Sequence, residues 1–519
     1  FTLLFFRRTF MSGLFGTLNT ARSGLDANQI GLQTSSHNIA NTNTEGYSRQ
    51  RVDLSTKIPY AKAGVGLIGS GVQADGISRI VDDFVRSQVR DSNSDYNSNV
   101  QKSDVLALLE NALHEPSDDG LITQLNNFAD SLQKLADNPE LDTAKTNSVQ
   151  MGIALASYIQ QTARQVSQVS TDTRSSLAKT VLDFNEKAEQ LVNLNQQLYD
   201  SHLSDEQPND LLDQRDSLLK DMSAESNLTV SFDKYGRASL SVGDHVIVDG
   251  KEGVQTKLNV VVSNSEGKTQ ILPNGDETQP KQTIDGDFTV GDIIFETAGG
   301  SGEYNKLAVK SGSIGGLQES LAEVESHRAE LNDFAKGVVE IENIVYSDGQ
   351  TPDSGFFEIT DPGDPALSIK INDDLVADPG KMKVGTGDDP AEGDNGRALA
   401  MAKALKSKLD YPVDTDNLLA NYNKDTLTFN NSKEGLTIPG AYNSIVTKNG
   451  ISKQKADNMA SAQLSALNQL EYKDQAASGV NLNEEMSDVI RFQQGFQANA
   501  KLLNVVSEML DTLINRTGV

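Results

Sequence analysis

Few residues in this chain have the types and spacing that could carry out chemistry. Gly64, Gly66 and Gly69 match the glycine spacing of a dinucleotide-binding loop, where bare backbone approaches a pyrophosphate at the start of a helix. The residues that follow, Ser70-Gly71-Val72, continue as loop or strand, and no strand-helix-strand unit surrounds them. The sequence therefore predicts a glycine-rich hairpin here rather than a nucleotide site.

Other candidate chemistry fails on spacing. Acidic pairs such as Asp373-Asp374 and Asp388-Asp389 lack the alternating oxygen ligands and the closing glutamate of a calcium loop. The chain has no cysteine, which excludes disulfides, thiolate nucleophiles and cysteine-based metal sites. None of the five histidines has the spacing of a metal site: His37, His114, His202, His245 and His327. We expect no catalytic residues, no metal and no cofactor, and we interpret the protein as a non-enzyme.

Charge and composition exclude two further classes of partner. The chain carries 45 basic against 73 acidic residues, a formal net charge of -28. Such a surface repels phosphate backbones and anionic lipids, so we expect no nucleic-acid and no membrane binding. A length of 519 residues predicts two or more domains.

Both ends of the chain carry apolar residues at the alternating four and three spacing of a coiled coil. The N-terminal series is Leu14, Leu18, Ala21, Leu25, Asn28, Leu32, Ser35 and Ile39. The C-terminal series is Leu482, Met486, Val489, Gln493, Phe496, Ala500, Leu503, Ser507, Leu510 and Ile514. Each helix needs a partner, so we predict that the termini pair and that their large apolar residues serve axial packing between subunits. The alternative is two surface helices of one globular domain.

Between the ends, the hydrophobic period switches several times. Helical spacing over 82–225 gives way at Leu228 to alternation with period two, and it returns from Ser311. We expect a mainly α, elongated, multidomain fold with β insertions. The expected parts are a terminal coiled-coil axial domain (12–50 and 478–519), a helical domain (51–227, 306–345 and 396–477), an inserted β domain (228–305) and a second small β insertion (346–395).

The first ten residues are apolar apart from Arg7 and Arg8, and the run is too short to span a bilayer. The amphipathic pattern opens at Met11. We interpret Met11 as the initiator and residues 1–10 as spurious upstream translation, with a short processed leader as the alternative.

The N-terminal series stops at a polar stretch, Asn38 to Gln50, which reads NIANTNTEGYSRQ. Asparagine and threonine compete with helical backbone hydrogen bonds, and Gly46 permits a positive φ angle. The stretch is therefore expected to end the helix and to form an elbow toward the next domain.

This stretch resembles the signature of flagellar axial proteins, the superfamily of rod, hook and junction proteins. Its ending resembles the hook-associated protein 1 family more than the hook and rod proteins. The residues that carry the signature are Asn38, Ile39, Ala40, Asn41, Gly46, Tyr47, Ser48, Arg49 and Gln50. Similar agreement is found in Leu211–Leu219 (LLDQRDSLL), Gly393–Leu399 (GDNGRAL), Gly479–Glu485, Phe492–Gln494 and Ala498–Ala500. The match is looser in the β insertions and at Val345–Gly349, where the family often has a histidine and a glycine.

The resemblance implies a structural role at the junction between flagellar hook and filament, which permits filament assembly. It implies export through the flagellar secretion apparatus to an extracellular position. The implied partners are the hook protein, a second junction protein on the filament side, further copies in a helical tubular assembly, and a cytoplasmic export chaperone at the C-terminal helix around Phe496, Leu503 and Leu510. The alternatives are a flagellar hook protein, or a secreted adhesin or enzyme with helical stalks.

Overall fold

The computed structural model describes most of the chain. The described residues are 2–62, 66–113, 120–204, 208–265, 268–297, 302–349, 355–387, 390–430 and 432–512, with side chains described from residue 13. Gly64, His114, the pair Asp388-Asp389 and Ile514 lie outside these residues. Among the described helices, none combines the length and the hydropathy that crossing a membrane requires.

The chain divides into two compact units. The first unit contains residues 1–94, 184–257 and 463–519, and the second contains residues 95–183 and 258–462. Three long helices contribute to both units: α2 (Asp83–Leu113), α4 (Asp142–Leu203) and α11 (Ile438–Ser478). This division differs from the domain bounds expected from the sequence, because periodicity detects a helix but not which of its turns packs on which core.

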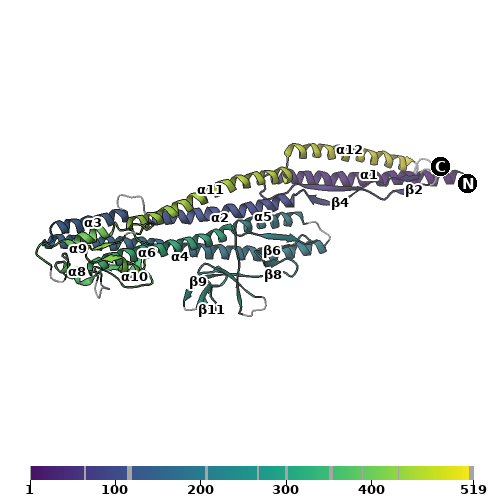
Figure 1. Cartoon of the computed structure of the whole chain (residues 1–519). Coiled ribbons are helices and arrows are strands. Elements are labelled where there is room, and N and C mark those ends of the chain that lie inside the picture. The colour runs from purple at the N-terminus through teal and green to yellow at the C-terminus, as the bar shows by residue number, and fades with distance from the viewer. Residues whose placement is uncertain are drawn as a thin grey trace. The chain divides into compact units, whose positions relative to one another are not determined.

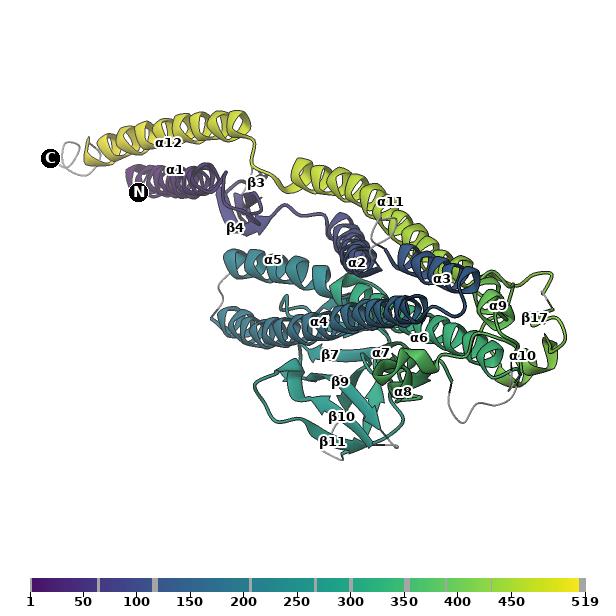
Figure 2. The same cartoon turned by 90° about the vertical axis from the view of Figure 1, so that its left-hand side faces the viewer.

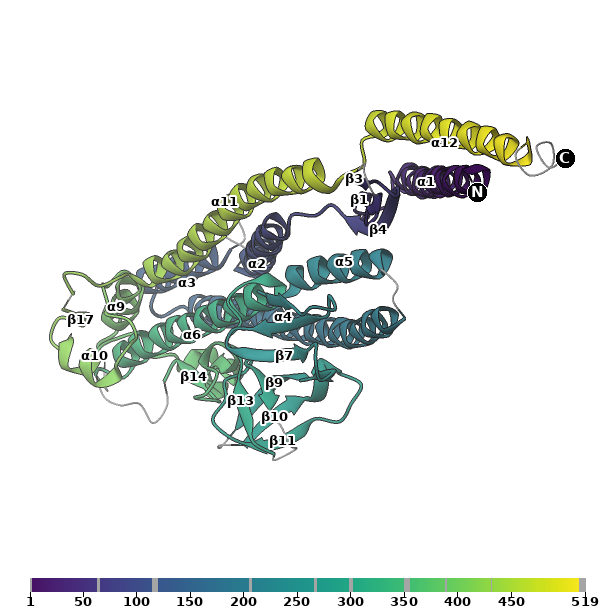
Figure 3. The same cartoon turned by 90° about the vertical axis from the view of Figure 1, so that its right-hand side faces the viewer.

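In the first unit, the two ends of the chain form a helix pair. α1 (Thr2–Ala40) lies against α12 (Leu482–Asp511) over much of its length, as all three views show (Figures 1, 2 and 3). The predicted pairing of the termini is confirmed. α1 carries no proline, and Asn481 caps α12 by accepting a hydrogen bond from the backbone N–H of Asn483.

Strands follow α1 in the same unit. β1 (Gln50–Thr56) pairs antiparallel with β4 (Val72–Arg79), and β2 (Tyr60–Lys62) pairs with β3 (Gly66–Ile68). The antiparallel pairing of β2 with β3 agrees with the expected hairpin, whose residues 63–65 lie outside the described residues, and Val72 begins a strand rather than a helix. Residues 50–56 and 72–79 thus form strands within the range expected for the helical domain, and the bounds of that domain stay a prediction.

α5 (Asn209–Glu225) and a four-stranded sheet complete the first unit. The sheet order is β5-β6-β7-β8, with strands Thr229–Phe232, Ala238–Val242, His245–Asp249 and Val254–Gln255. Alternate residues of β6, Ala238, Leu240 and Val242, are fully buried, as a half-buried strand requires.

The second unit contains a five-stranded sheet in the order β11-β10-β9-β12-β13 (Figure 3). Its strands are β9 (Leu258–Ser265), β10 (Lys268–Leu272), β11 (Gln282–Asp285), β12 (Ile293–Glu296) and β13 (Tyr304–Lys306), with the short helix η1 (Pro273–Gly275). Val261, Ile271 and Ile294 form its buried cluster. The range 228–305, expected as one inserted β domain, thus contains two sheets that fall in two compact units.

Helices of the second unit bury the apolar faces that the sequence predicts. α3 (Leu121–Asp137) packs on α9 (Gly396–Ala404), and α9 packs on α6 (Gly312–Tyr346) (Figure 2). The α3 positions Leu121, Leu125, Phe128, Leu132 and Leu135 are buried. The predicted small β insertion is a two-stranded sheet mixed with short helices: β14 (Phe357–Ile359), α7 (Pro365–Ser368), β15 (Ile369–Ile371), α8 (Asp373–Ala377) and η2 (Pro379–Lys381). The remaining elements are α10 (Thr415–Asn421), β16 (Tyr422–Asn423) and β17 (Thr428–Phe429).

Candidate assembly site at the terminal helix pair

The seam between α1 and α12 is built on glycine. A Cβ atom on Gly24 would lie 2.8 Å from the side chain of Asn499, and one on Gly31 would lie 2.6 Å from the ring of Phe492. In the opposite direction, a Cβ on Gly495 would lie 2.4 Å from Asn28. A step of seven residues along α1 matches a step of seven backward along α12, so the pair is antiparallel. The absence of side chains lets the two backbones approach closely.

This register adds glycines to the predicted seam, and axial packing of the predicted large apolar residues stays a prediction. Gly24 and Gly31 face α12, whereas the predicted Leu25 and Leu32 are only partly buried beside them, as are Leu14, Leu18 and Ile39. Counting heptads on large apolar residues selects leucines, but the closest approach of two helices selects small ones.

On α12, the predicted seam residues are likewise only partly buried: Val489, Phe496, Leu503 and Leu510. Phe492 and Val506 complete their face. Met486 is 57% exposed, so it lies outside the seam of this pair. Its neighbour Glu485 takes that position and is 1% exposed. Packing of Met486 against other subunits stays a prediction.

Asn38 lies at the end of the seam, and both the nitrogen and the oxygen of its side-chain amide make hydrogen bonds. Its Nδ2 donates to the backbone carbonyl of Gln50 at 2.9 Å and to Oε2 of Glu485 at 3.0 Å. Its Oδ1 accepts from the Tyr47 hydroxyl at 2.7 Å and from the Gln50 N–H at 3.0 Å. Asn38 is 1% exposed. One buried side chain thus joins α1, the elbow, β1 and α12.

Tyr47 packs over the end of α1. Its hydroxyl lies 3.0 Å from Nδ1 of His37, and the two rings meet edge to face. Burial raises the pKa of Tyr47 above its usual value, and the carboxylates of Asp213, Asp210 and Glu485 raise that pKa further. The phenol therefore stays protonated and keeps its role as a hydrogen-bond donor to Asn38.

Arg49 connects α12 with the end of α11. Its Nε donates to Glu485 at 2.6 Å and its Nη1 donates to Glu484 at 2.9 Å. Its backbone N–H donates to the carbonyl of Ser478, the last residue of α11, at 2.8 Å. Burial lowers the pKa of Arg49, but the hydrogen bond to Glu485 and both carboxylates outweigh burial and raise the pKa overall. The guanidinium is a permanent cation at the negative first turn of α12.

Ser48 brings the second signature stretch into the site. Its N–H donates to Oδ2 of Asp213 at 3.1 Å and its hydroxyl donates to Oδ1 of Asp213 at 2.6 Å. Arg79 donates to Oδ1 of Asp213 at 2.6 Å and to Asp216 at 3.0 Å. Arg86 donates to the Ser48 hydroxyl at 2.8 Å. Stretches more than 160 positions apart, which stand in the sequence as separate motifs, therefore meet in one buried network.

The charge on Asp216 is held by three arginines. Burial alone would raise the pKa of Asp216, but Arg215, Arg79 and Arg86 outweigh burial and lower it. Arg79 and Arg86 were not predicted from the sequence. The pair of aspartates in LLDQRD could have indicated them, since buried carboxylates require cations or donors nearby.

The other signature residues have supporting positions. Gly46 has a φ of 76°, which a side chain rarely adopts, and it lies against Ser217 of α5. Gln50 donates to Asp210 at 3.3 Å. Ile39 and Asn41 are partly buried, whereas Ala40 is exposed.

The third signature stretch, GDNGRAL, lies in the second unit. Arg397 is 1% exposed, donates to the carbonyls of Gly385 and Tyr346, and pairs with Asp348 at 2.6 Å. Asp348 has a φ of 54° and lies where the sequence departs from the family pattern. The arginine holds the C-terminal end of α6 and stabilises this variant turn.

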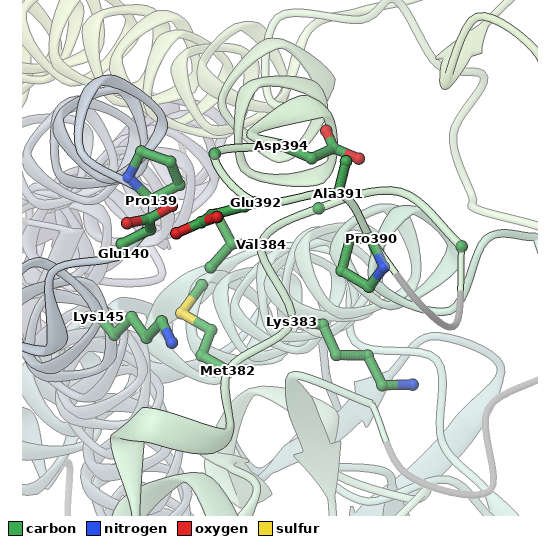
Figure 4. A pocket seen from close by; sticks show the side chains of 13 residues that line it. Pro139, Glu140, Lys145, Met382, Lys383, Val384, Pro390, Ala391, Glu392 and Asp394 are labelled. Atoms are coloured by element: carbon green, nitrogen blue, oxygen red, sulfur yellow. The ribbon is translucent and has the colours of Figure 1, made fainter.

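A hollow of about 460 Å³ lies beside the GDNGRAL stretch (Figure 4). Pro139, Glu140 and Lys145 line it together with segments 382–387 and 390–394. Lys145 donates to the carbonyl of Gly380, and Asp394 accepts from Thr386. The described residues that line it include no serine, histidine or cysteine, and the described part of the chain contains no cluster fit to bind a metal.

Known families match three regions of the chain. The helical domain of flagellar hook-associated protein FlgK matches residues 106–357, the flagella basal body rod protein family matches 18–47, and the C-terminal family of flagellar basal body rod FlgEFG proteins matches 475–516. The two rod families thus match α1 with the elbow and α12 with the end of α11.

Relatives match the chain from end to end. Flagellar hook-associated protein 1 of Bacillus subtilis is 28% identical over 98% of this chain and 99% of the relative. The proteins of the same name in Salmonella typhimurium and Escherichia coli are 26% and 25% identical, over 96% of this chain and 99% of each relative. The structure of the flagellar hook junction protein FlgK from Burkholderia pseudomallei has the same fold, with a TM-score of 0.56 and 15% identity over 76% of this chain and all of that one.

The paired ends and the elbow lie where the two rod families match. The helical-domain match and the full-length relatives point to one kind of flagellar protein. The chain is similar to flagellar hook-associated protein 1 over nearly its whole length.

Proposed function

We propose that this protein is a structural subunit of the junction between flagellar hook and filament, on which the filament assembles. The observation that carries the proposal is the antiparallel terminal helix pair, fixed to the first unit by Asn38, Ser48 and Arg49. A pair of helices with a seam of glycines and partly buried leucines gains little from burial alone. Neighbouring copies would supply the missing contacts.

Outward-facing residues of α12 support self-association in a tube. Ile490, Leu502, Val505 and Met509 are between 42% and 52% exposed, and all lie outside the seam with α1. A row of exposed apolar residues on a paired helix is typical of a further protein interface. We assign this row to contacts with other copies in the assembly.

The remaining partners follow the family. The hook protein would bind on one side of the zone and a second junction protein on the filament side. Before assembly, a cytoplasmic chaperone would cover the C-terminal helix around Phe496, Leu503 and Leu510, and the chain would leave the cell through the flagellar secretion apparatus. A hook protein is the alternative, and it would restore hooks rather than filaments.

A deletion strain tests the role directly. The strain should bear hooks without filaments and release flagellin into the medium, and the gene for this chain should restore filaments. Immunogold labelling should mark a narrow band at the distal end of the hook. Label along the whole hook would instead support the hook-protein alternative.

Leu503→Asp tests the helix pair. It places a carboxylate in the seam, where desolvation without a partner costs more than the roughly 1.5–3 kcal/mol gained by burying one leucine. We expect filament growth to fail while the purified chain keeps the melting temperature of its central domains. Lys501→Asp, at an exposed position two residues away, is the control and should be silent. Secreted amounts of each variant must match, so that export defects are excluded. Unfolding of the soluble core by Leu503→Asp would contradict the axial role of α12.

A further inference from the structure

The hairpin that runs from β1 through β2 and β3 to β4 exposes apolar side chains on one side. Ile58 is 90% exposed, more than any other large apolar side chain that the structure describes, and Leu67 is 73% exposed. The cross-strand partners Leu54 and Ala74 are both exposed, and so are the partners Ala61 and Leu67. We call these five residues the hairpin patch. A contiguous apolar surface of this kind is typical of a protein interface.

The other side of the hairpin packs on α1. A Cβ on Gly16 would lie 3.2 Å from the hydroxyl of Tyr60, and the N–H of Val72 donates to the Ser23 hydroxyl at 3.2 Å. Tyr60 belongs to the ladder rung next to that of Leu67, and neighbouring rungs point their side chains to opposite faces. The hairpin patch therefore faces away from α1. In all three views α1 lies between α12 and β4 (Figures 1, 2 and 3).

A second apolar patch lies level with the hairpin on the helix pair. The seam places Gly24 opposite Asn499 in antiparallel register, so Gly16, which the hairpin contacts, lies level with Ser507 of α12. Around this level, three side chains of α12 are between 42% and 52% exposed and follow the i, i+3, i+7 spacing of one helix face. This α12 patch consists of Leu502, Val505 and Met509.

The two patches carry opposite charge. Residues 54–74 of the hairpin include two lysines and no acidic residue, whereas residues 502–511 of α12 include two acidic residues and no basic one. Lys57 and Glu508 are exposed next to their patches. The whole chain has a net charge of -28, so most of its surface repels a second copy. These two patches can approach each other without that repulsion.

We propose that the hairpin patch of one copy binds the α12 patch of a second copy. The inference rests on the proposed assembly of copies in the junction and names the surfaces that meet. Because the two patches are different surfaces of one molecule, the contact is head-to-tail and repeats from copy to copy, which builds a ring or a helix. Since both patches lie level on the helix pair, neighbouring copies stand side by side, as the wall of a tube requires.

Introduced cysteines test the contact directly. The chain contains no cysteine, so a disulfide can form only where two introduced thiols meet. One strain produces Leu67→Cys and Val505→Cys on separate copies, without the unchanged chain. Oxidation of its intact flagella should give a product of twice the chain mass. Either variant alone should give no such product, and neither should Leu67→Cys together with Val254→Cys, at an exposed position of β8.

Three results of this experiment overturn the inference. A dimer from Leu67→Cys alone would show that two hairpins meet each other. A product of Leu67→Cys with another protein would show a different occupant of the hairpin patch. The absence of any product when Leu67→Cys is combined with Val505→Cys, and also with Met509→Cys, would show that the two patches do not meet.

Exchanging the charges tests the same contact through assembly. Lys57→Glu should lower the number of filaments per cell about tenfold, because it sets two carboxylates against each other. Glu508→Lys should do the same, and the two changes together should restore filaments. Lys251→Glu, at an exposed lysine of the same unit, should be silent. All four variants should be secreted normally and keep the melting temperature of the unchanged chain, because the altered side chains are exposed.

A double variant no better than either single variant would overturn the pairing of the two patches. A lowered melting temperature with Lys57→Glu would show that the lysine stabilises the monomer, and it would overturn the inference as well. If the unchanged gene itself fails to restore filaments, the proposed function fails rather than this inference.

Discussion

The side chain of Asn38 joins the elements that meet at the elbow. All of its described polar contacts are made inside the protein, with α12, β1 and Tyr47. An asparagine is suited to this position because it offers two donors and two acceptor sites on one planar group. Neither an aspartate nor a leucine of similar size would satisfy the same four neighbours.

Asn38→Ala should therefore destabilise the elbow. It leaves the Glu485 carboxylate, the Tyr47 hydroxyl and both backbone groups of Gln50 short of a partner, at a cost of roughly 3 kcal/mol. We expect faster hydrogen exchange of the amides of α1 and β1 and a lower urea midpoint by circular dichroism. Asn43→Ala, at an exposed asparagine of the same motif, should leave both unchanged. Equal effects of the two changes would contradict the role assigned to Asn38.

The buried side chain of Glu342 should give the folding stability an unusual pH dependence. It lies on α6 with 0% exposure, and no described group hydrogen-bonds either carboxylate oxygen. Burial raises the pKa of Glu342 well above its ordinary value. The folded state therefore holds a proton that the unfolded state releases near pH 4.5, so stability falls as pH rises from that value toward the folded pKa, by about 1.4 kcal/mol per pH unit.

Glu342→Gln should remove this loss of folding stability at higher pH. The amide has the shape of the protonated acid and no charge, so the variant should exceed the unchanged protein in urea midpoint at pH 7 and match it near pH 4. Glu319→Gln, on the same helix with its side chain 61% exposed, should show no such pH-dependent gain. A Glu342→Gln chain less stable than the unchanged one at pH 7 would mean that Glu342 is ionised and paired.

At the scale of the element, the glycines of α1 differ in whether a side chain would fit at their positions. A Cβ on Gly31 would meet the ring of Phe492, whereas a Cβ on Gly13 would meet nothing within 4 Å. Glycine lowers helix stability by about 1 kcal/mol relative to alanine, so a glycine retained inside a helix calls for a steric reason. Gly31 has that reason in the seam, and among the described residues Gly13 has none.

Gly31→Leu and Gly13→Leu form a matched pair. At position 31 the new side chain must displace Phe492, so α12 should separate from α1 and filament formation should fall strongly. At position 13 the change should raise helix propensity and leave the pair intact. Distances between spin labels on α1 and α12 measure the separation, and an unchanged distance with Gly31→Leu would disprove the glycine seam.

The elements also show what the sequence could and could not predict. Apolar spacing predicted α1, α12 and their pairing, because burial of a stripe on a long helix leaves few alternatives. It could not predict the glycine contacts of the register, since Gly24 and Gly31 carry no hydrophobic side chain that a spacing pattern detects. It also missed the meeting of Ser48 with Asp213, because a contact across 165 positions leaves no local period to detect.

For the whole molecule, the predicted behaviour of the isolated subunit remains open to test. From the sequence we expect a monomer in which 12–50 and 480–519 are mobile; the buried contacts of Asn38, Ser48 and Arg49 confine that motion to the parts of α1 and α12 beyond the elbow, where the outward apolar row of α12 has no partner in a monomer. Brief protease treatment should trim both ends and leave a resistant core. Ends that resist cleavage at low protein concentration would show that the pair is stable without neighbouring copies.

The hydrogen bond between Asn38 and Glu485 joins residues 447 positions apart, which has a kinetic consequence. Contacts between such distant positions pay the largest loop-closure entropy and form late. At roughly 5–20 residues per second of synthesis, α1 waits on the order of 20–90 s for its partner to be made. During that time the elbow lacks Glu485 and Gly31 lacks Phe492, so the N-terminal helix cannot complete its fold early. Closing the two ends is thus the step that the order of synthesis places last.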